Sequence, residues 1–201
     1  MEEFPSPWAE ALIKEHQIII RMEKDLPNGI PAYKYESEEG AVVVMDKTLP
    51  VERLNFAFSH ELAHILLEHS DEVDANEEKE ANRFASELLM PFDEFSRLAH
   101  ESLEALKEYF PQASYEAIAN RKLFFNPGVL TVYDNEFFTR RVMSDGFAAP
   151  LNPTDIEKKV IFECYSAKGP ITHYMDNLVL NATYVDTGRG FRRVLLLVEE
   201  S

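Results

Sequence analysis

The sequence predicts an α+β fold: a small antiparallel sheet packed on two consecutive helices, then further helices and a mixed α/β C-terminal module. Apolar residues recur every three to four positions over residues 52–68 and 77–90, which is the spacing of helices with one buried face. Short β-branched or alternating runs at residues 32–36 and 41–45, and again after residue 128, are typical of strands. The 201 residues, 45% of them hydrophobic, suffice for one core or for one core plus a small module.

The first part of the chain is predicted to build the sheet. Residues 8–16 have helical spacing, after which residues 17–21 become β-branched and indicate a strand. Residues 32–36 and 41–45 form a predicted hairpin with its turn at residues 38–40. We expect residues 41–45 to be an edge strand that leads directly into the first of the two central helices.

The chain changes character at Asn126-Pro127-Gly128, a turn signal that follows two or three predicted helices in residues 92–125. We therefore divide the chain into residues 1–125 and a C-terminal module, residues 126–201, that serves as a sensor or as a docking site for a partner or substrate. The elements predicted in this module are strands at residues 129–133 and 137–142, a helix at residues 154–166, and a hairpin of residues 178–185 and 191–198 with its turn at residues 187–190.

Composition excludes several classes of protein. Twenty basic and thirty-six acidic residues give a net charge of −16, which repels phosphate backbones, so direct nucleic-acid binding is not expected. The sequence contains neither an apolar run of membrane-spanning length nor a recognisable signal peptide, which predicts a cytoplasmic protein without a membrane segment. The only cysteine, Cys164, lies in an apolar run and is expected to be a core residue.

His60, Glu61 and His64 form an H-E-x-x-H motif inside the first central helix. On a helix the two histidines lie about 40° apart in rotation and roughly 6 Å apart in rise, so both imidazoles can reach one ion. Zinc suits such a pair, because a catalytic zinc site combines three protein ligands with an open position for water. Glu61 is then the candidate general base that takes a proton from that water.

The alternative is a solvent-facing turn of an amphipathic helix. It is disfavoured because the helix is strongly apolar, and burying a carboxylate and two imidazoles without partners is costly. A purely structural zinc site is disfavoured as well, since such sites are rich in cysteine. The second helix opens with Glu77, Glu78 and Glu80, any of which could supply the third ligand, and spacing alone does not choose among them.

The paired pattern is far more specific than either half: H-E-x-x-H at residues 60–64 is followed by E-x-E-A-N-x-F-A-x-x-L-L-M-P at residues 78–91. In these residues the chain resembles the ImmA/IrrE metallopeptidases. The resemblance implies a gluzincin-like zinc site, with Mn²⁺ as the alternative ion, in which Glu78 is the third ligand and Glu80 the runner-up. One helical turn after Glu78, Asn82 is placed to hydrogen-bond a ligand side chain.

The resemblance also implies a function. Members of this family are regulatory endopeptidases that cut a helix-turn-helix transcriptional repressor, which here would be the protein partner. The competing hypothesis is a non-catalytic, antitoxin-like binding protein that retains the metal site, and the intact Glu61 argues against it. The sequence does not rank His100, Tyr165, His173 and Tyr174 as donors to an oxyanion. His69 is expected to be a helix-end or solvent-facing residue, and a fourth metal ligand is the lesser alternative.

Overall fold

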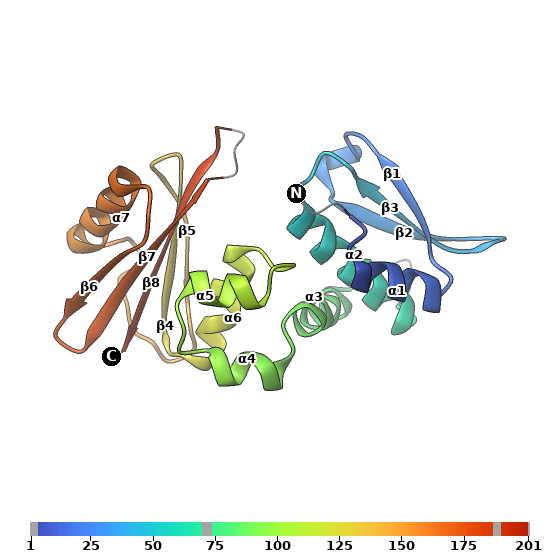
Figure 1. Cartoon of the computed structure of the whole chain (residues 1–201). Helices are drawn as coiled ribbons and strands as arrows, with labels where there is room; N and C mark the ends of the chain where they lie inside the picture. Colours follow the sequence, from blue (N-terminus) through green and yellow to red (C-terminus); the bar gives the residue numbers. More distant parts are fainter. Residues whose placement is uncertain (1–3, 70–73, 187–189, 201) are drawn as a thin grey trace. The chain divides into compact units, whose positions relative to one another are not determined.

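The structure, a computed structural model, describes residues 4–69, 74–186 and 190–200 (Figure 1). Most of the predicted turn at residues 187–190 therefore lies outside the described residues. The chain forms two compact units. The first comprises the residues up to Glu94 together with Phe110–Ser114, and the second comprises Phe95–Tyr109 and the chain from Tyr115 onward.

The first unit is built on a three-stranded sheet with the strand order β1-β3-β2. Strand β3 runs parallel to β1 and antiparallel to β2. The strands are β1 (Ile19–Glu23), β2 (Ala32–Ser37) and β3 (Gly40–Asp46), and the helical elements are α1 (Pro7–Glu15), the 3-10 turn η1 (Pro27–Gly29), α2 (Val51–Leu66) and α3 (Ala75–Leu89).

Strand β3 is the central strand of this sheet, so the expectation that residues 41–45 form an edge was wrong. Val42, Val43, Val44 and Met45 are all at most 1% exposed, because helices cover one face of the sheet and Leu26 and Tyr35 pack on the other. A strand that is buried on both faces has a continuous apolar run, as residues 41–45 do. Such a run indicates a central strand, whereas the prediction had assigned these residues to an edge strand. The exposed edges are β1 and β2, and the parallel pairing of β1 makes the sheet mixed.

Helix α2 is the core element of the first unit. Phe58 and Leu62 are fully buried and pack with Val43 and Met45 of the sheet. Trp8 of α1 packs on Phe58, with ring centroids 6.1 Å apart. Helix α3 also lies against α2, and its start is fixed by a capping box formed by the side chains of Asp74 and Glu77.

The second unit contains a five-stranded antiparallel sheet with the order β5-β4-β8-β7-β6. Its strands are β4 (Gly128–Asp134), β5 (Phe137–Met143), β6 (Ile171–Met175), β7 (Leu178–Asp186) and β8 (Arg192–Glu200). Its helices are α5 (Leu103–Tyr109), α6 (Tyr115–Phe125) and α7 (Asp155–Ala167), and α4 (Phe92–Leu98) begins in the first unit. Strand β6 was not predicted from the sequence.

Helices cover both faces of this sheet, α7 on one side and α6 on the other (Figure 1). Val198 of β8 belongs to the core beneath α7. Its neighbour Glu199 points to the opposite face, where it binds Lys122 of α6 at 2.7 Å. Alternation along one strand thus separates an apolar layer from a layer that holds a buried ion pair.

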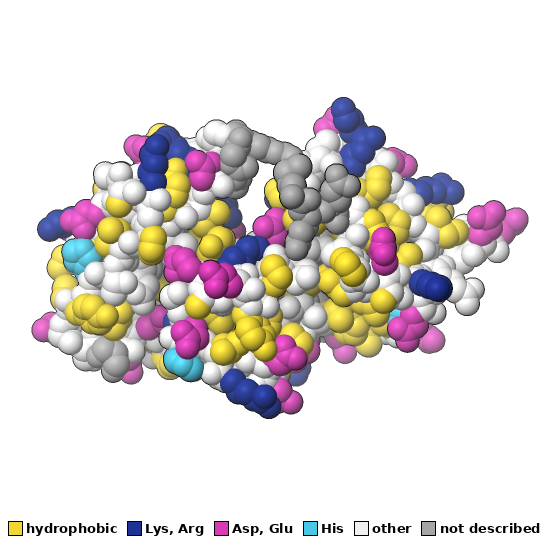
Figure 2. All heavy atoms as spheres, in the orientation of Figure 1, with side chains coloured by type: hydrophobic (Ala, Val, Ile, Leu, Met, Phe, Trp, Pro, Cys, Tyr) yellow, Lys and Arg dark blue, Asp and Glu magenta, His cyan; other side chains and the backbone are white. Residues whose placement is uncertain are grey.

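The fold class is confirmed as α+β. Within the described ranges, no helix has the length and apolar character needed to cross a bilayer. On the face shown in Figure 2, acidic and basic side chains are interspersed over both units and do not separate into large single-sign areas.

Candidate metal centre

Helix α2 holds its two motif histidines on one face, at the side turned toward α3. The side chain of His64 is 4% exposed and that of His60 is 16% exposed. Their Nε2 atoms lie 3.0 Å apart, and their ring centroids are 4.7 Å apart in an edge-on arrangement. Burial lowers the pKa of His64, and nearby His60 lowers it further, so this imidazole is favoured in the neutral form that ligates metals.

Glu78 of α3 brings a carboxylate to the same place. Its two oxygens lie 3.5 Å from Nε2 of His60 and 3.7 Å from Nε2 of His64. One donor atom from each of these three residues lies within 4.8 Å of the others. Glu80, the runner-up from the sequence, lies instead against His69, with its Oε2 3.5 Å from Nε2 of that histidine.

The donor set fits a divalent cation. Oδ1 of Asn82 lies 3.2 Å from Nδ1 of His60, and because an amide oxygen only accepts, that nitrogen carries the proton. Nε2 of His60 therefore carries no proton. Its lone pair faces Nε2 of His64 and the Glu78 carboxylate. Converging lone pairs repel one another unless a cation lies between them, and two imidazoles with one carboxylate form a donor set found in catalytic zinc sites.

Glu61 follows His60 on α2 and is mostly buried. Burial raises the pKa of its carboxyl group to about 7. The charge and the backbone N–H of Lys34 oppose this rise, whereas the negative charge of Glu78 adds to it. A carboxylate whose pKa lies near neutrality can both accept and return a proton, which is the property required of a general base.

His69 lies just beyond the end of α2, but it does not face solvent, and that part of the expectation was wrong. Its side chain is 6% exposed, and its Nδ1 lies 2.8 Å from Nδ1 of His64. The chain leaves the α-helix at Leu67, and Glu68 takes a left-handed conformation with φ of 55°. The predicted helix, residues 52–68, ran two residues beyond the observed end at Leu66, and continued helical rotation would have turned the His69 side chain away from His64.

The four residues considered as oxyanion donors all belong to the second unit. The hydroxyl of Tyr165 donates to the carbonyl of Tyr133 at 2.9 Å, and the phenol side chain is buried there. The other three have surface positions: His173 pairs with Glu163, His100 pairs with Glu101, and Tyr174 is 80% exposed.

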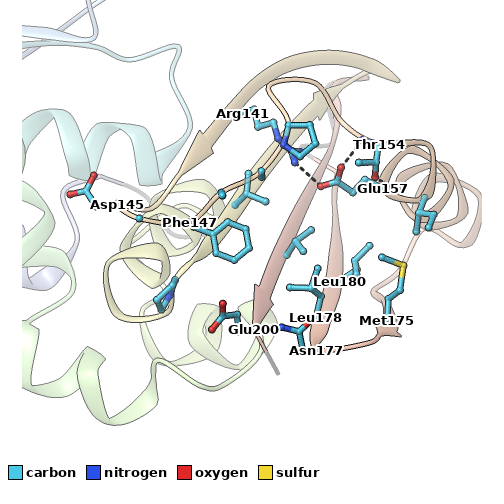
Figure 3. Close-up of a pocket in the computed structure, with 18 residues that line it drawn as sticks. Arg141, Asp145, Phe147, Thr154, Glu157, Met175, Asn177, Leu178, Leu180 and Glu200 are labelled. Atoms are coloured by element: carbon cyan, nitrogen blue, oxygen red, sulfur yellow. Dashed lines mark hydrogen bonds and ion pairs between the residues drawn. The ribbon is translucent and has the colours of Figure 1, made fainter.

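The second unit has a concave site of its own, a cavity of about 650 Å³ (Figure 3). In Figure 3, Phe147, Leu178 and Leu180 point into it. Arg141 and Glu157 lie together at one end and form a buried ion pair at 2.8 Å. Most of the lining is apolar and the buried guanidinium is neutralised by a carboxylate, but Asp145 and Glu200 add two more acidic side chains.

These features define a class of protein: an α+β domain in which an H-E-x-x-H helix and a following glutamate form a metallopeptidase-like centre. The sequence matches the family model Peptidase_M78, the IrrE N-terminal-like domain, over residues 13–122, which is more than half of the chain. The chain therefore belongs to this family, and the resemblance noted from the sequence is confirmed.

One solved structure with a similar fold is a Mycobacterium tuberculosis transcriptional regulator, with a TM-score of 0.60 and 16% sequence identity. The match covers 96% of this chain and 79% of that chain. At this identity the likeness supports the fold and nothing more specific. No match was found among curated proteins.

Proposed function

We propose that the protein is a zinc-dependent endopeptidase that cleaves a helix-turn-helix transcriptional repressor at a specific site. The observation that carries the proposal is the convergence of His60, His64 and Glu78, beside a mostly buried Glu61. His60, His64 and Glu78 are the proposed ligands and Glu61 is the proposed catalytic base. The repressor, as the substrate class, comes from the family resemblance.

In the proposed hydrolysis of a peptide bond, the protein side chains hold the metal ion and transfer the proton, and activation of the water and of the scissile carbonyl comes from the ion. A zinc ion bound by the three ligands would lower the pKa of a coordinated water and polarise the scissile carbonyl. Glu61 accepts the proton of the attacking water and transfers it to the nitrogen of the leaving amine. The bare Nε2 of His60, maintained by the Asn82 contact, keeps that imidazole ready to ligate.

The substrate is proposed to bind along strand β2. This strand is an edge of the sheet, and its Lys34 lies close enough to Glu61 for its charge and its backbone to lower the pKa of that carboxyl group. An extended peptide can add to such an edge through main-chain hydrogen bonds, which holds a peptide bond in a fixed register. Strand β3, the edge expected from the sequence, is paired on both sides and cannot serve.

The proposal is tested by measuring bound zinc and the cleavage of a repressor encoded beside this protein. Wild type, Glu61→Gln and Glu78→Ala are compared. We expect Glu61→Gln to bind zinc like wild type and to cleave at least 100-fold more slowly, because the amide cannot accept the proton. We expect Glu78→Ala to lose zinc, because two imidazoles alone hold the ion weakly.

Three outcomes would contradict the proposal or one of its assignments. If Glu61→Gln cleaves as fast as wild type, the protein does not use the proposed base. If wild type binds zinc and the repressor but cleaves nothing, the antitoxin-like binding function is favoured instead. Normal zinc binding by Glu78→Ala, combined with loss of zinc in Glu80→Ala, would move the third ligand to Glu80.

We also propose that residues 126–201 act as a sensor or docking module. The cavity of the second unit supports this, since a mainly apolar lining that also carries the acidic Asp145 and Glu200 suits a largely apolar group without negative charge. Ala149→Trp should fill the cavity. We expect it to leave the cleavage of a short peptide unchanged and to alter the cleavage of the intact repressor. Equal rates for wild type and variant on both substrates would contradict this role.

A further inference from the structure

A buried histidine lies directly behind the proposed ligand His64. Nδ1 of His69 is 2.8 Å from Nδ1 of His64, and Nε2 of His69 is 3.5 Å from Oε2 of Glu80. Nε2 of His64, on the opposite side of its ring, faces His60 and Glu78. The contacts therefore run in a line from the proposed metal position through two imidazoles to a carboxylate on α3.

The backbone at the end of α2 places His69 there. Its N–H donates to the carbonyl of His64 at 3.1 Å, and the N–H of Glu68 donates to the carbonyl of Ile65 at 3.3 Å. With Glu68 left-handed, this is the Schellman motif, which turns the chain back across the last helical turn. The rings of His64 and His69 consequently meet edge-on, with centroids 4.9 Å apart.

Only one arrangement of protons suits both this line and a metal ligand. A ligating nitrogen must be bare, so ligation through Nε2 of His64 requires a proton on its Nδ1. That N–H can donate only if Nδ1 of His69 is bare as well. The proton of His69 then resides on Nε2, on the side of the Glu80 carboxylate.

We infer that His69 is a positioning residue for the metal centre. It accepts the Nδ1–H of His64, which fixes the tautomer and the ring orientation that ligation needs, and Glu80 holds it in place from behind. The inference rests on the proposed function, because it presupposes an ion bound by His60, His64 and Glu78. It also gives Glu80 a role other than that of a ligand.

The first test compares zinc affinities of full-length variants by competition with a chromophoric chelator. His69→Leu keeps bulk but removes the acceptor, and we expect it to bind zinc about 10–100-fold more weakly. His69→Asn should bind within about three-fold of wild type, because its Oδ1 stands where Nδ1 stood and can accept the same hydrogen bond. The control is His100→Leu, at a side chain that is 74% exposed, and we expect no change.

The second test needs no variant, so it applies even if His69→Leu does not fold. Nitrogen-15 NMR of the zinc-loaded wild type distinguishes protonated from bare imidazole nitrogens. We expect a proton on Nδ1 of His64, and in His69 a proton on Nε2 with a bare Nδ1. A proton on Nδ1 of His69 would overturn the inference.

The outcomes distinguish a failure of the His69 inference from a failure of the proposed zinc-peptidase function. If the wild type binds no zinc, the proposed function fails first. If the wild type binds zinc and a folded His69→Leu binds it equally well, only the role of His69 is refuted. If His69→Asn binds as weakly as His69→Leu, acceptance of the His64 proton is refuted as the mechanism.

Discussion

At the scale of single residues, the proposed metal centre depends on which nitrogen of each imidazole carries its proton. Asn82 sets this for His60, since its Oδ1 can only accept from Nδ1. The Asn82 side chain is exposed, so its replacement should leave the fold intact. Helical spacing predicted that Asn82 hydrogen-bonds a ligand side chain, and in the structure its contact is with the proposed ligand His60.

The contact predicts a loss of metal affinity without a loss of fold. Asn82→Leu should weaken zinc binding about 10–100-fold, because His60 loses the partner that orients it. Asn82→Asp keeps an acceptor and should bind much more tightly than the leucine variant. Chelator competition measures both, with Asn76→Leu as a control at another exposed asparagine of α3. Equal affinities for Asn82→Leu and wild type would show that the contact has no role.

The sequence predicted those features of the proposed metal centre that depend on residues close together in the chain. A motif within one helix predicted that His60 and His64 share a face, and the structure brings them together. The choice between Glu78 and Glu80 depends on how α3 packs on α2, which spacing does not encode. His69 was misplaced because its position depends on the helix ending at Leu66, and Glu68 is not the glycine that usually signals such an end.

At the scale of elements, a buried ion pair fastens α6 to the sheet of the second unit. Lys122 and Glu199 have side chains only 6% and 8% exposed, and two contacts of 2.7 and 2.9 Å join them. The side-chain amide of Asn126 donates to the same carboxylate at 3.2 Å. A charge this deeply buried is tolerated only while its partner is present.

Removal of one partner should therefore be costly. Glu199→Ala should lower the free energy of unfolding by about 3–5 kcal/mol, because it leaves the Lys122 ammonium buried without its counter-charge. Lys122→Met combined with Glu199→Met should recover most of that loss, since no charge remains buried. Urea denaturation followed by circular dichroism gives both values. A loss below about 1 kcal/mol in the alanine variant would mean that water reaches the pair.

Element identities were easier to predict than element neighbours. Apolar periodicity indicated α2, α3 and α7, and alternation indicated most strands. Periodicity does not say which strand lies beside which, so the central position of β3 and the parallel pairing of β1 were not foreseen. Strand β6 was missed because it is a short edge strand whose side chains, apart from half-buried Ile171 and His173, are exposed.

At the scale of the whole molecule, each of the two units contains a residue whose signal reports its unfolding. The only tryptophan, Trp8, packs in the first unit, and the only cysteine, Cys164, is buried in the second. Burial raises the pKa of the Cys164 thiol to about 12, and its Sγ lies 3.2 Å from the carbonyl of Gly169. A thiol in this state does not form a thiolate near neutral pH, so it should react with disulfide reagents only after the second unit opens.

Removal of the metal should consequently lower the stability of the first unit alone, and only Trp8 reports on that unit. An ion that binds only the folded first unit stabilises it, by about 2.7 kcal/mol at a free concentration one hundred times the Kd. We expect a chelator to lower the urea midpoint seen by Trp8 fluorescence and to leave the midpoint of Cys164 labelling unchanged. Equal shifts of the two midpoints would show that the units unfold as one, and rapid labelling without urea would refute the burial of Cys164.

The left-handed backbone conformation of Glu68 lowers the stability of the folded chain, so a substitution there can raise its melting temperature. A left-handed backbone costs a residue with a side chain roughly 1–2 kcal/mol, and glycine avoids most of that cost. The Glu68 side chain is exposed, so Glu68→Gly should raise the melting temperature by several degrees without altering zinc affinity. A lower melting temperature would mean that the Glu68 side chain makes a stabilising contact. The turn that brings His69 to His64 is thus a place where thermal tolerance can be engineered beside the proposed metal centre.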